Sequence, residues 1–255
     1  MATCSAGWQV TLVLIIAASL LGGVLSVLLA GTVLVVRPAL VEPALPRLIS
    51  FSTGALLGAA LLGMIPHAAG TLAVSTITFV FLAGLISFYV LEKLLVWRHC
   101  HKEDCSVHAT SGPLLLIGDA FHNFVDGVVM ASAFVGSTEL GIAVALSTTA
   151  HEVPQEVGEF MVYLHAGWTP RRALSLNILT SLTSLVGAVT GYFALAGMRG
   201  VGPYLLTVAA AGFVYVALAD LVPAQRGRTS FGMAILDLLL VGTGIGVVAV
   251  FAHGH

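Results

Sequence analysis

Long apolar runs, separated by short polar segments, set the organisation of this chain. Eight such runs occur, at residues 8–36, 48–70, 71–97, 111–136, 140–164, 172–197, 201–224 and 231–252. A helix needs about 20 apolar residues to cross ~30 Å of hydrocarbon, and each run is long enough. The pattern predicts an all-α membrane protein with eight transmembrane helices. The short connections favour a single transmembrane domain over residues 1–255.

The composition agrees with a membrane protein and excludes an ordinary soluble domain. Of the 255 residues, 58% are hydrophobic and 9% are charged, and most of the 28 glycines lie inside apolar runs. Membrane helices tolerate glycine more readily than soluble helices do. The three cysteines supply no disulfide framework, and the absence of a basic patch argues against a nucleic-acid partner.

The basic residues predict the orientation in the bilayer. Nine of the ten fall on one side of the predicted topology: Arg37, Arg47, Lys93, Arg98, Lys102, Arg171, Arg172, Arg226 and Arg228. Only Arg199 falls on the other side. Because cytoplasmic loops carry the excess of Lys and Arg, we expect both termini to be extracytoplasmic. The expected location is a multi-pass position in the plasma or inner membrane.

Acidic residues inside the predicted spans have no basic partners there. They are Asp119, Asp126, Glu152, Glu156, Glu159 and Asp220. A carboxylate at the bilayer centre costs about 2.5–3.5 kcal/mol on insertion scales. Such groups must be protonated, hydrated in a cavity or neutralised by a bound cation. The neighbouring His and Asn residues add neutral ligands but no positive charge, which favours a cation.

Helical spacing gathers these polar residues on two faces. In the fourth span Asp119, His122, Asn123 and Asp126 fall within an arc of about 100°. In the fifth span His151, Glu152, Gln155, Glu156 and Glu159 cover roughly 140°. Imidazole with carboxylate is the ligand set of zinc and similar divalent metals, whereas magnesium or calcium needs only oxygen. The two faces therefore predict a transition-metal site between these helices.

Structural interpretations compete with this one. An intramembrane His or Asn can simply form hydrogen bonds between helices. Asp119, Glu156 and Glu159 are candidates for residues behind the ligands or along the metal pathway, and Asp220 for a capping or gating residue. The pairs Gly54/Gly58 and Gly187/Gly191 have the GxxxG spacing typical of close helix packing.

The loop after the third span, residues 98–110, is a second candidate metal site. It contains His99, Cys100, His101, Cys105 and His108 within the stretch RHCHKEDCSVH. Such a density of sulfur and imidazole ligands can bind zinc. A solvated cytoplasmic loop with histidines placed by chance is the equal alternative.

HNFVDG, beginning at His122, followed by HEVPQEVGEF, beginning at His151, closely resembles the paired signatures of the ZIP (Zrt/Irt-like) divalent-metal transporters. The second stretch is most similar to the subgroup whose fifth helix carries HExPHExGDF. GALLGAALLGMIP (54–66) and GFVYVALADLVP (212–223) extend the likeness. The resemblance implies a homodimer in the lipid bilayer that moves zinc, or iron, manganese or cadmium, into the cytoplasm. It also implies elevator-type alternating access, with spans 1, 4, 5 and 6 as the transport unit and spans 2, 3, 7 and 8 as the scaffold.

The resemblance also implies particular metal ligands. The primary site corresponds to His122, Asp126, His151 and Gln155, and a neighbouring second site to Asn123 and Glu152, with Asn177 as a further ligand. Two features depart from the family pattern. Gln155 replaces the usual His or Glu, which weakens the case for two metals. Gly63 and His67 stand where HxxPE is common, which alters the expected outer mouth.

Two other functions use similar residues. A non-transporting metal receptor or sensor needs the same ligands, and the sequence does not separate it from a transporter. An intramembrane zinc hydrolase would carry HExxH. Here Gln155 occupies the place of the second His and Pro154 interrupts the helix. We therefore expect no enzymatic activity and no resident cofactor, with zinc as transported cargo.

Overall fold

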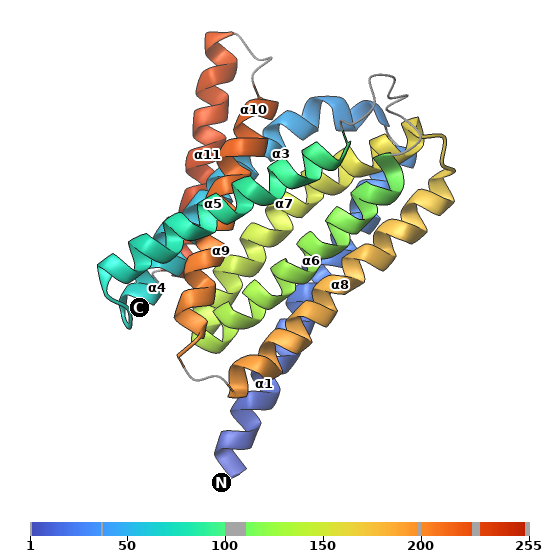
Figure 1. Ribbon diagram of the computed structural model, residues 1–255. Helices are drawn as coiled ribbons and strands as arrows, with labels where there is room; N and C mark the ends of the chain where they lie inside the picture. The colour runs from blue at the N-terminus through green and yellow to red at the C-terminus, as the bar shows by residue number, and fades with distance from the viewer. Residues whose placement is uncertain (1, 37, 100–110, 198–199, 226–229, 253–255) are drawn as a thin grey trace.

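The computed structural model describes residues 2–36, 38–99, 111–197, 200–225 and 230–252, and these residues form helices and short connections without any strand. Figure 1 shows the helices arranged as one elongated bundle. In chain order they are α1 (Ala2–Leu20), α2 (Ser26–Val36), α3 (Pro38–Gly58), α4 (Ile65–Ala69), α5 (Val74–His99), α6 (Ser111–Gly136), α7 (Thr138–His165), α8 (Pro170–Gly197), α9 (Gly202–Val216), α10 (Val222–Ala224) and α11 (Phe231–Ala252). The π-helical turns η1 (Leu21–Leu25), η2 (Ala59–Met64) and η3 (Ala217–Leu221) join α1 to α2, α3 to α4 and α9 to α10.

Helix occupies all eight ranges for which the sequence predicts a span, so the all-α prediction is confirmed. Six stretches are long and apolar enough to cross a membrane: 9–32, 44–69, 74–94, 170–195, 202–219 and 231–252. Neither α6 nor α7 is among the six. These two helices carry most of the buried acids and the site histidines, and those residues lower their hydropathy. The two further crossings stay a prediction.

The hairpin of α6 and α7 has clear local signals. Ser137, in extended conformation, caps α7, and its hydroxyl accepts a hydrogen bond from the Leu140 N–H at 3.0 Å. Such a cap satisfies an amide that the first helical turn leaves unpaired. At the other end of α7, Gly167 adopts a φ of +82°, a value that glycine tolerates without strain. The two helices therefore run antiparallel, side by side along most of their length (Figure 1).

Glycines bring neighbouring helices into backbone contact. A Cβ at Gly187 of α8 would strike the Phe124 carbonyl of α6, and one at Gly191 would meet Val128. A Cβ at Gly54 of α3 would likewise strike Val241 of α11. The prediction that the two GxxxG pairs serve close packing is confirmed. The α6–α8 contact is the most extensive in the described chain, followed by α3–α11.

These contacts sort the helices into two groups. The first contains α1, α2, α6, α7 and α8, and the second contains α3, α4, α5, α9, α10 and α11. Between the groups lies an apolar core in which half of the buried side chains are alanine, including Ala55, Ala60, Ala143 and Ala210, beside larger ones such as Leu56, Met64 and Phe213. The metal candidates of α6 and α7 lie beside this boundary, where His151 contacts Phe213.

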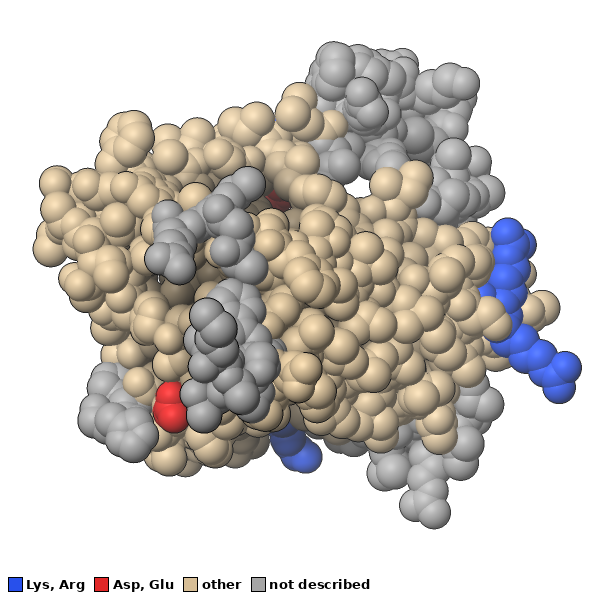
Figure 2. All heavy atoms as spheres, turned by 90° about the horizontal axis from the view of Figure 1, so that it is seen from below, with Lys and Arg blue, Asp and Glu red and all other residues tan. Residues whose placement is uncertain are grey.

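The outer surface suits a lipid environment. Large apolar side chains are exposed on most helices, among them Phe79, Ile86, Val186 and Leu238. On the face drawn in Figure 2, uncharged side chains dominate and the basic ones lie at the margins. The first described residues of α1 and the last of α11 lie at the same end of the bundle (Figure 1). This agrees with an even number of spans, and the side of the membrane stays a prediction.

Candidate metal centre

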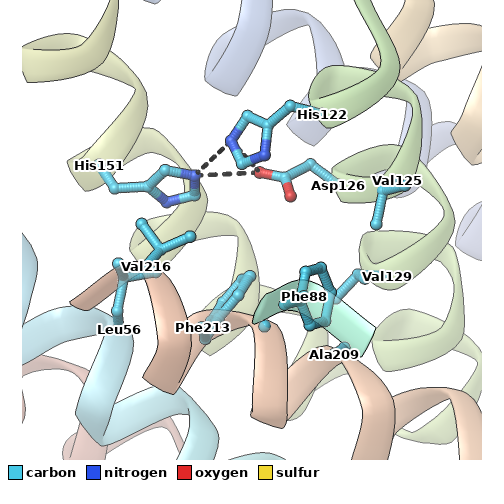
Figure 3. A pocket seen from close by; sticks show the side chains of 11 residues that line it. Leu56, Phe88, His122, Val125, Asp126, Val129, His151, Ala209, Phe213 and Val216 are labelled. Carbon is cyan, nitrogen blue, oxygen red and sulfur yellow. Dashed lines mark hydrogen bonds and ion pairs between the residues drawn. The ribbon is translucent and has the colours of Figure 1, made fainter. Parts of the chain in front are cut away.

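Four side chains from α6 and α7 converge on one point. His122, Asp126, His151 and Glu152 each offer a ligand atom, and these atoms all lie within 4.8 Å of one another. His151 Nε2 is 3.1 Å from Asp126 Oδ2 and 3.3 Å from His122 Nε2. Glu152 Oε1 is 3.6 Å from His122 Nε2 and 3.8 Å from His151 Nε2. Figure 3 shows both imidazoles and the Asp126 carboxylate directed toward the same space.

These separations fit a tetrahedral divalent ion. Nitrogen and oxygen ligands bind zinc at about 2.0–2.2 Å, so tetrahedral ligands lie about 3.3–3.6 Å apart. The five distances that involve a histidine nitrogen, 3.1–4.0 Å, bracket that value. Two neutral imidazoles and two carboxylates would carry two negative charges, which a divalent cation neutralises. Among the described residues, no other group of three or more His, Cys, Asp and Glu brings its ligand atoms this close together.

The backbone of α7 orients the His151 ring. Nδ1 of His151 lies 3.0 Å from the Ser147 carbonyl oxygen. A carbonyl can only accept a hydrogen bond, so Nδ1 carries the proton and the neutral ring presents the lone pair of Nε2 to the other ligands. This is the arrangement that metal-binding histidines usually show, with the second nitrogen fixed by an acceptor. Phe213 packs edge-on against the ring, with 5.7 Å between centroids.

Three of the four carboxylate oxygens of the centre lack hydrogen-bond donors. Both oxygens of Glu152 and Oδ2 of Asp126 are buried without a hydrogen-bond partner. The two residues are only 1% and 3% exposed, so bulk water does not compensate them. A buried polar group without a partner is costly, and a buried charge much more so. Such oxygens suit a site whose missing partner is a cation.

Three other predicted acids, Asp119, Glu156 and Glu159, have protein donors. The Asn123 amide donates to Asp119 Oδ1 at 2.7 Å, and the Asn177 amide donates to Glu156 Oε2 at 2.6 Å. Glu159 accepts from two donors, the Gln155 amide and the Tyr163 hydroxyl, each at 3.2 Å. Oδ2 of Asp119 and Oδ1 of Asn177 remain unpaired. These polar pairs extend along α7 from the four-residue centre toward the α7–α8 connection.

Two cavities adjoin the centre, and His122 lines both. A pocket of about 40 Å³ lies between α3, α5, α6, α7 and α9. Besides His122, Asp126 and His151, apolar residues such as Leu56, Phe88 and Phe213 line it (Figure 3). A larger pocket of about 360 Å³ is lined by Ile49, His122, Pro154, Gln155, Val216 and Leu221. The centre thus borders a narrow apolar space and a wider space that Gln155 reaches.

Some residues that the sequence singled out lie elsewhere. Gln155 lines the larger pocket together with His122, and its amide donates a hydrogen bond to Glu159 at 3.2 Å. His67 lies beside Gly136 at the end of α6. Gly136 is about four helical turns from His122 along this helix, or ~21 Å at 1.5 Å per residue. Asp220 belongs to η3, and its side chain is outside the description. His99 ends α5, and Cys100, His101, Cys105 and His108 lie outside the described residues.

Sequence reasoning did not identify the supports of the centre. Ser147 supplies the carbonyl that orients His151, and it lies one turn before it on α7. That spacing is a usable signal, because a histidine can reach the carbonyl four residues earlier. Phe213 and Leu56 come from other helices, and nothing local in the sequence marks them as wall residues.

Comparison with known proteins agrees with the chemistry of this centre. Residues 96–252 match the profile of the family described as ZIP Zinc transporter. Zinc transporter ZIP4 of Rattus norvegicus is 44% identical over 116 residues, which cover 44% of this chain and 17% of that protein. Zinc transporter ZIP13 of Pongo abelii is 29% identical over 226 residues, covering 82% of this chain and 67% of that protein.

Zinc transporter SLC39A7 of Rattus norvegicus is 32% identical over 150 residues, covering 56% of this chain and 32% of that protein. The chain thus spans about a sixth of the length of rat ZIP4 and about a third of that of SLC39A7. These proteins are named as transporters, as the sequence predicts, and not as enzymes. The family profile covers more than half of the chain, and the chain belongs to the ZIP zinc transporter family.

Proposed function

We propose that this protein carries zinc across a membrane into the cytoplasm, with His122, Asp126, His151 and Glu152 as the ligands during passage. The observation that carries the proposal is the convergence of four ligand atoms within 4.8 Å, two of them from carboxylates without a counter-charge. A cation is the partner that satisfies all four at once. The names of the relatives, which are zinc transporters, support the choice of metal.

The cavities suggest the direction of release. The larger pocket touches Ile49, near the start of the second predicted span, and Gln155, in the second half of α7. Both lie on the side that the basic residues assign to the cytoplasm. Toward the opposite side, Met64, Leu140 and Val144 belong to the continuous apolar core. We infer that this conformation closes the centre toward the outside and gives it room toward the inside.

Alternating access then requires one group of helices to move against the other. Extensive contacts and glycine packing hold α6 to α8 and α3 to α11, whereas small apolar side chains line the boundary between the groups. A boundary of small side chains has few interlocking ridges that oppose sliding. This division supports an elevator-type movement of α1, α2, α6, α7 and α8 against a scaffold formed by the other helices.

Further parts of the proposal concern cargo and partners. Iron, manganese and cadmium accept overlapping ligand sets, so they are the competitors to test against zinc. We propose a homodimer embedded in lipid, with the loop 98–110 as a cytoplasmic receiver of the metal. Asn123 and Asn177 donate to Asp119 and Glu156 through their amide nitrogens, so these two bonds do not occupy the amide oxygens that would bind a second metal.

Radiotracer zinc uptake into proteoliposomes tests the function. The purified chain should accumulate zinc above protein-free liposomes, and His122→Ala should abolish uptake while the protein still inserts. Iron, manganese and cadmium added in excess rank the cargo. Zinc binding without any uptake would refute transport and leave a receptor or sensor. Uptake that is the same in the wild type and in His122→Ala would refute the site.

A further inference from the structure

A proline in α7 deprives one carbonyl next to the metal centre of its helical donor. Pro154 lies inside the helix and has no N–H, so the carbonyl of Ala150, four residues earlier, loses its helical donor. Ala150 directly precedes His151, whose Nε2 is part of the four-ligand group. The position of this carbonyl is therefore tied to the position of a ligand.

A hydroxyl from the other helix group takes the place of the missing N–H. Ser52 of α3 donates a hydrogen bond to the Ala150 carbonyl. Ser52 is completely buried, so water does not compete readily for either group. Its neighbours on α3 bind within their own group, Ser50 to Asp237 of α11 at 2.8 Å and Thr53 to Gln225 at 3.1 Å. Of these three hydroxyls, only that of Ser52 reaches the metal-carrying helix.

If α7 moved away from α3, the Ser52 hydroxyl and the Ala150 carbonyl would be affected differently. Ser52 also lies 2.8 Å from the Leu48 carbonyl of its own helix, so its hydroxyl keeps an acceptor if α7 moves away. The Ala150 carbonyl has no such substitute, because Pro154 removes the donor. Ser147 of α7 resembles Ser52 in having two acceptors. Its hydroxyl lies 3.0 Å from the Ala55 carbonyl of α3 and 2.9 Å from the Ala143 carbonyl of its own helix.

From this asymmetry we propose that Ser52 is a positioning residue for transport, which holds α7, and with it His151, against α3 by completing the hydrogen bond that Pro154 removes. Moving α7 would leave the Ala150 carbonyl unpaired in the apolar boundary, which disfavours the moved state. The proline and the serine thus act as one unit. The inference rests on the proposed function only in requiring that α7 moves relative to α3.

Thiol labelling of a buried reporter tests this without metal or flux. Ala143 of α7 is fully buried in the core between the groups, so Ala143→Cys reacts with a maleimide only when the boundary opens. The reporter is placed in the full chain with Cys4, Cys100 and Cys105 changed to serine. When closing is fast, the labelling rate is proportional to the opening equilibrium. Ala60→Cys, equally buried on η2, is the second reporter.

Ser52→Ala should raise the labelling rate about five-fold or more, because it leaves the carbonyl unpaired in the closed state. Ser52→Thr, which keeps a hydroxyl, should label at the parent rate. In a Pro154→Ala background α7 regains its own donor, and Ser52→Ala should then change the rate less than about two-fold.

Ser50→Ala is the matched control, since it removes a buried hydroxyl of the same helix that binds α11 and Pro46 instead of α7. It should leave labelling unchanged. The proposal is overturned if Ser52→Ala labels like the parent, if Ser50→Ala accelerates labelling equally, or if the Ser52→Ala effect is the same with and without Pro154. Because the readout needs no zinc, a failure of uptake would leave these results intact.

Discussion

Nε2 of His151 on α7 lies 3.1 Å from Oδ2 of Asp126 on α6, while Nδ1 of the same ring donates a hydrogen bond to the Ser147 carbonyl. The nitrogen that faces the carboxylate is therefore the one without a proton in the neutral ring. With the ring neutral, both atoms present lone pairs to the space between the two helices, so a metal ion placed there would bind both. A change on either helix should affect the same binding event.

Replacing either member of this pair should weaken zinc binding strongly. We expect His151→Ala and Asp126→Ala each to lower zinc affinity by roughly 100-fold. Loss of a residue that only supports a ligand lowers metal affinity by about 10–100-fold, and loss of a ligand itself should cost at least the upper end of that range. The double variant should lose less than the product of the two, because both residues serve one ion. Isothermal titration of the purified protein measures this. Phe121→Ala, an exposed position on α6, is the control, and native affinity in both single variants would remove the pair from the site.

Two glutamates of α7 should respond differently to the same substitution. Glu152→Gln removes a charge whose oxygens have no donor, so we expect zinc affinity to fall by roughly ten-fold or more. Glu156→Gln keeps an oxygen for the Asn177 amide and should change zinc affinity less than about three-fold. Equal losses in both variants would mean that the zinc is shared along α7 and is not held at the four-residue centre.

Gln155 offers a test of the larger pocket. Its amide now binds Glu159, but it lies one turn after His151 and lines the cavity that His122 also borders. Gln155→His should bring a third imidazole to the ion and tighten zinc binding by roughly ten-fold, with slower release during uptake. Gln155→Ala, which only loses the contact with Glu159, should bind zinc like the native chain. If His and Ala at position 155 behave alike, the side chain there does not reach the metal.

Glycine packing predicts a stability difference between two similar substitutions. A Cβ at Gly187 would overlap the Phe124 carbonyl, so Gly187→Ala must force α6 and α8 apart at a cost of about 1–3 kcal/mol or more. Gly158→Ala on α7 meets nothing within 4 Å and should be neutral or slightly stabilising. Thermal unfolding in detergent should show a lower Tm for Gly187→Ala alone. A comparable drop for both would mean that the backbone contact between α6 and α8 at Gly187 does not limit stability.

Much of the fold could be predicted from the sequence, because hydropathy and length report directly on what crosses a bilayer. The helix positions follow from the apolar runs, and the polar faces of α6 and α7 follow from the 3.6-residue period. Periodicity gives the face of a helix but not the rotamer or the partner of each side chain. Gln155 shares a face with His151, yet it turns to Glu159, one turn further along α7.

Contacts between distant helices lay beyond the sequence. Ser52 and Ala150 are 98 positions apart, and Phe213 reaches His151 from α9. The acids illustrate the same limit: composition indicated that all lacked basic partners, but only the structure separates Glu152, without a donor, from Glu156, which binds Asn177. Which acid holds a metal depends on neighbours that no local pattern specifies.

Zinc K-edge X-ray absorption of the purified protein with one equivalent of zinc identifies the atoms that hold the metal. We expect four nitrogen and oxygen ligands at about 2.0–2.2 Å, with the multiple-scattering signature of two imidazoles and no sulfur. In His122→Ala and His151→Ala one imidazole should disappear. Sulfur scattering at about 2.3 Å in the native protein would place the first zinc on cysteine, away from α6 and α7, and would rule out the four-residue centre as the primary zinc site.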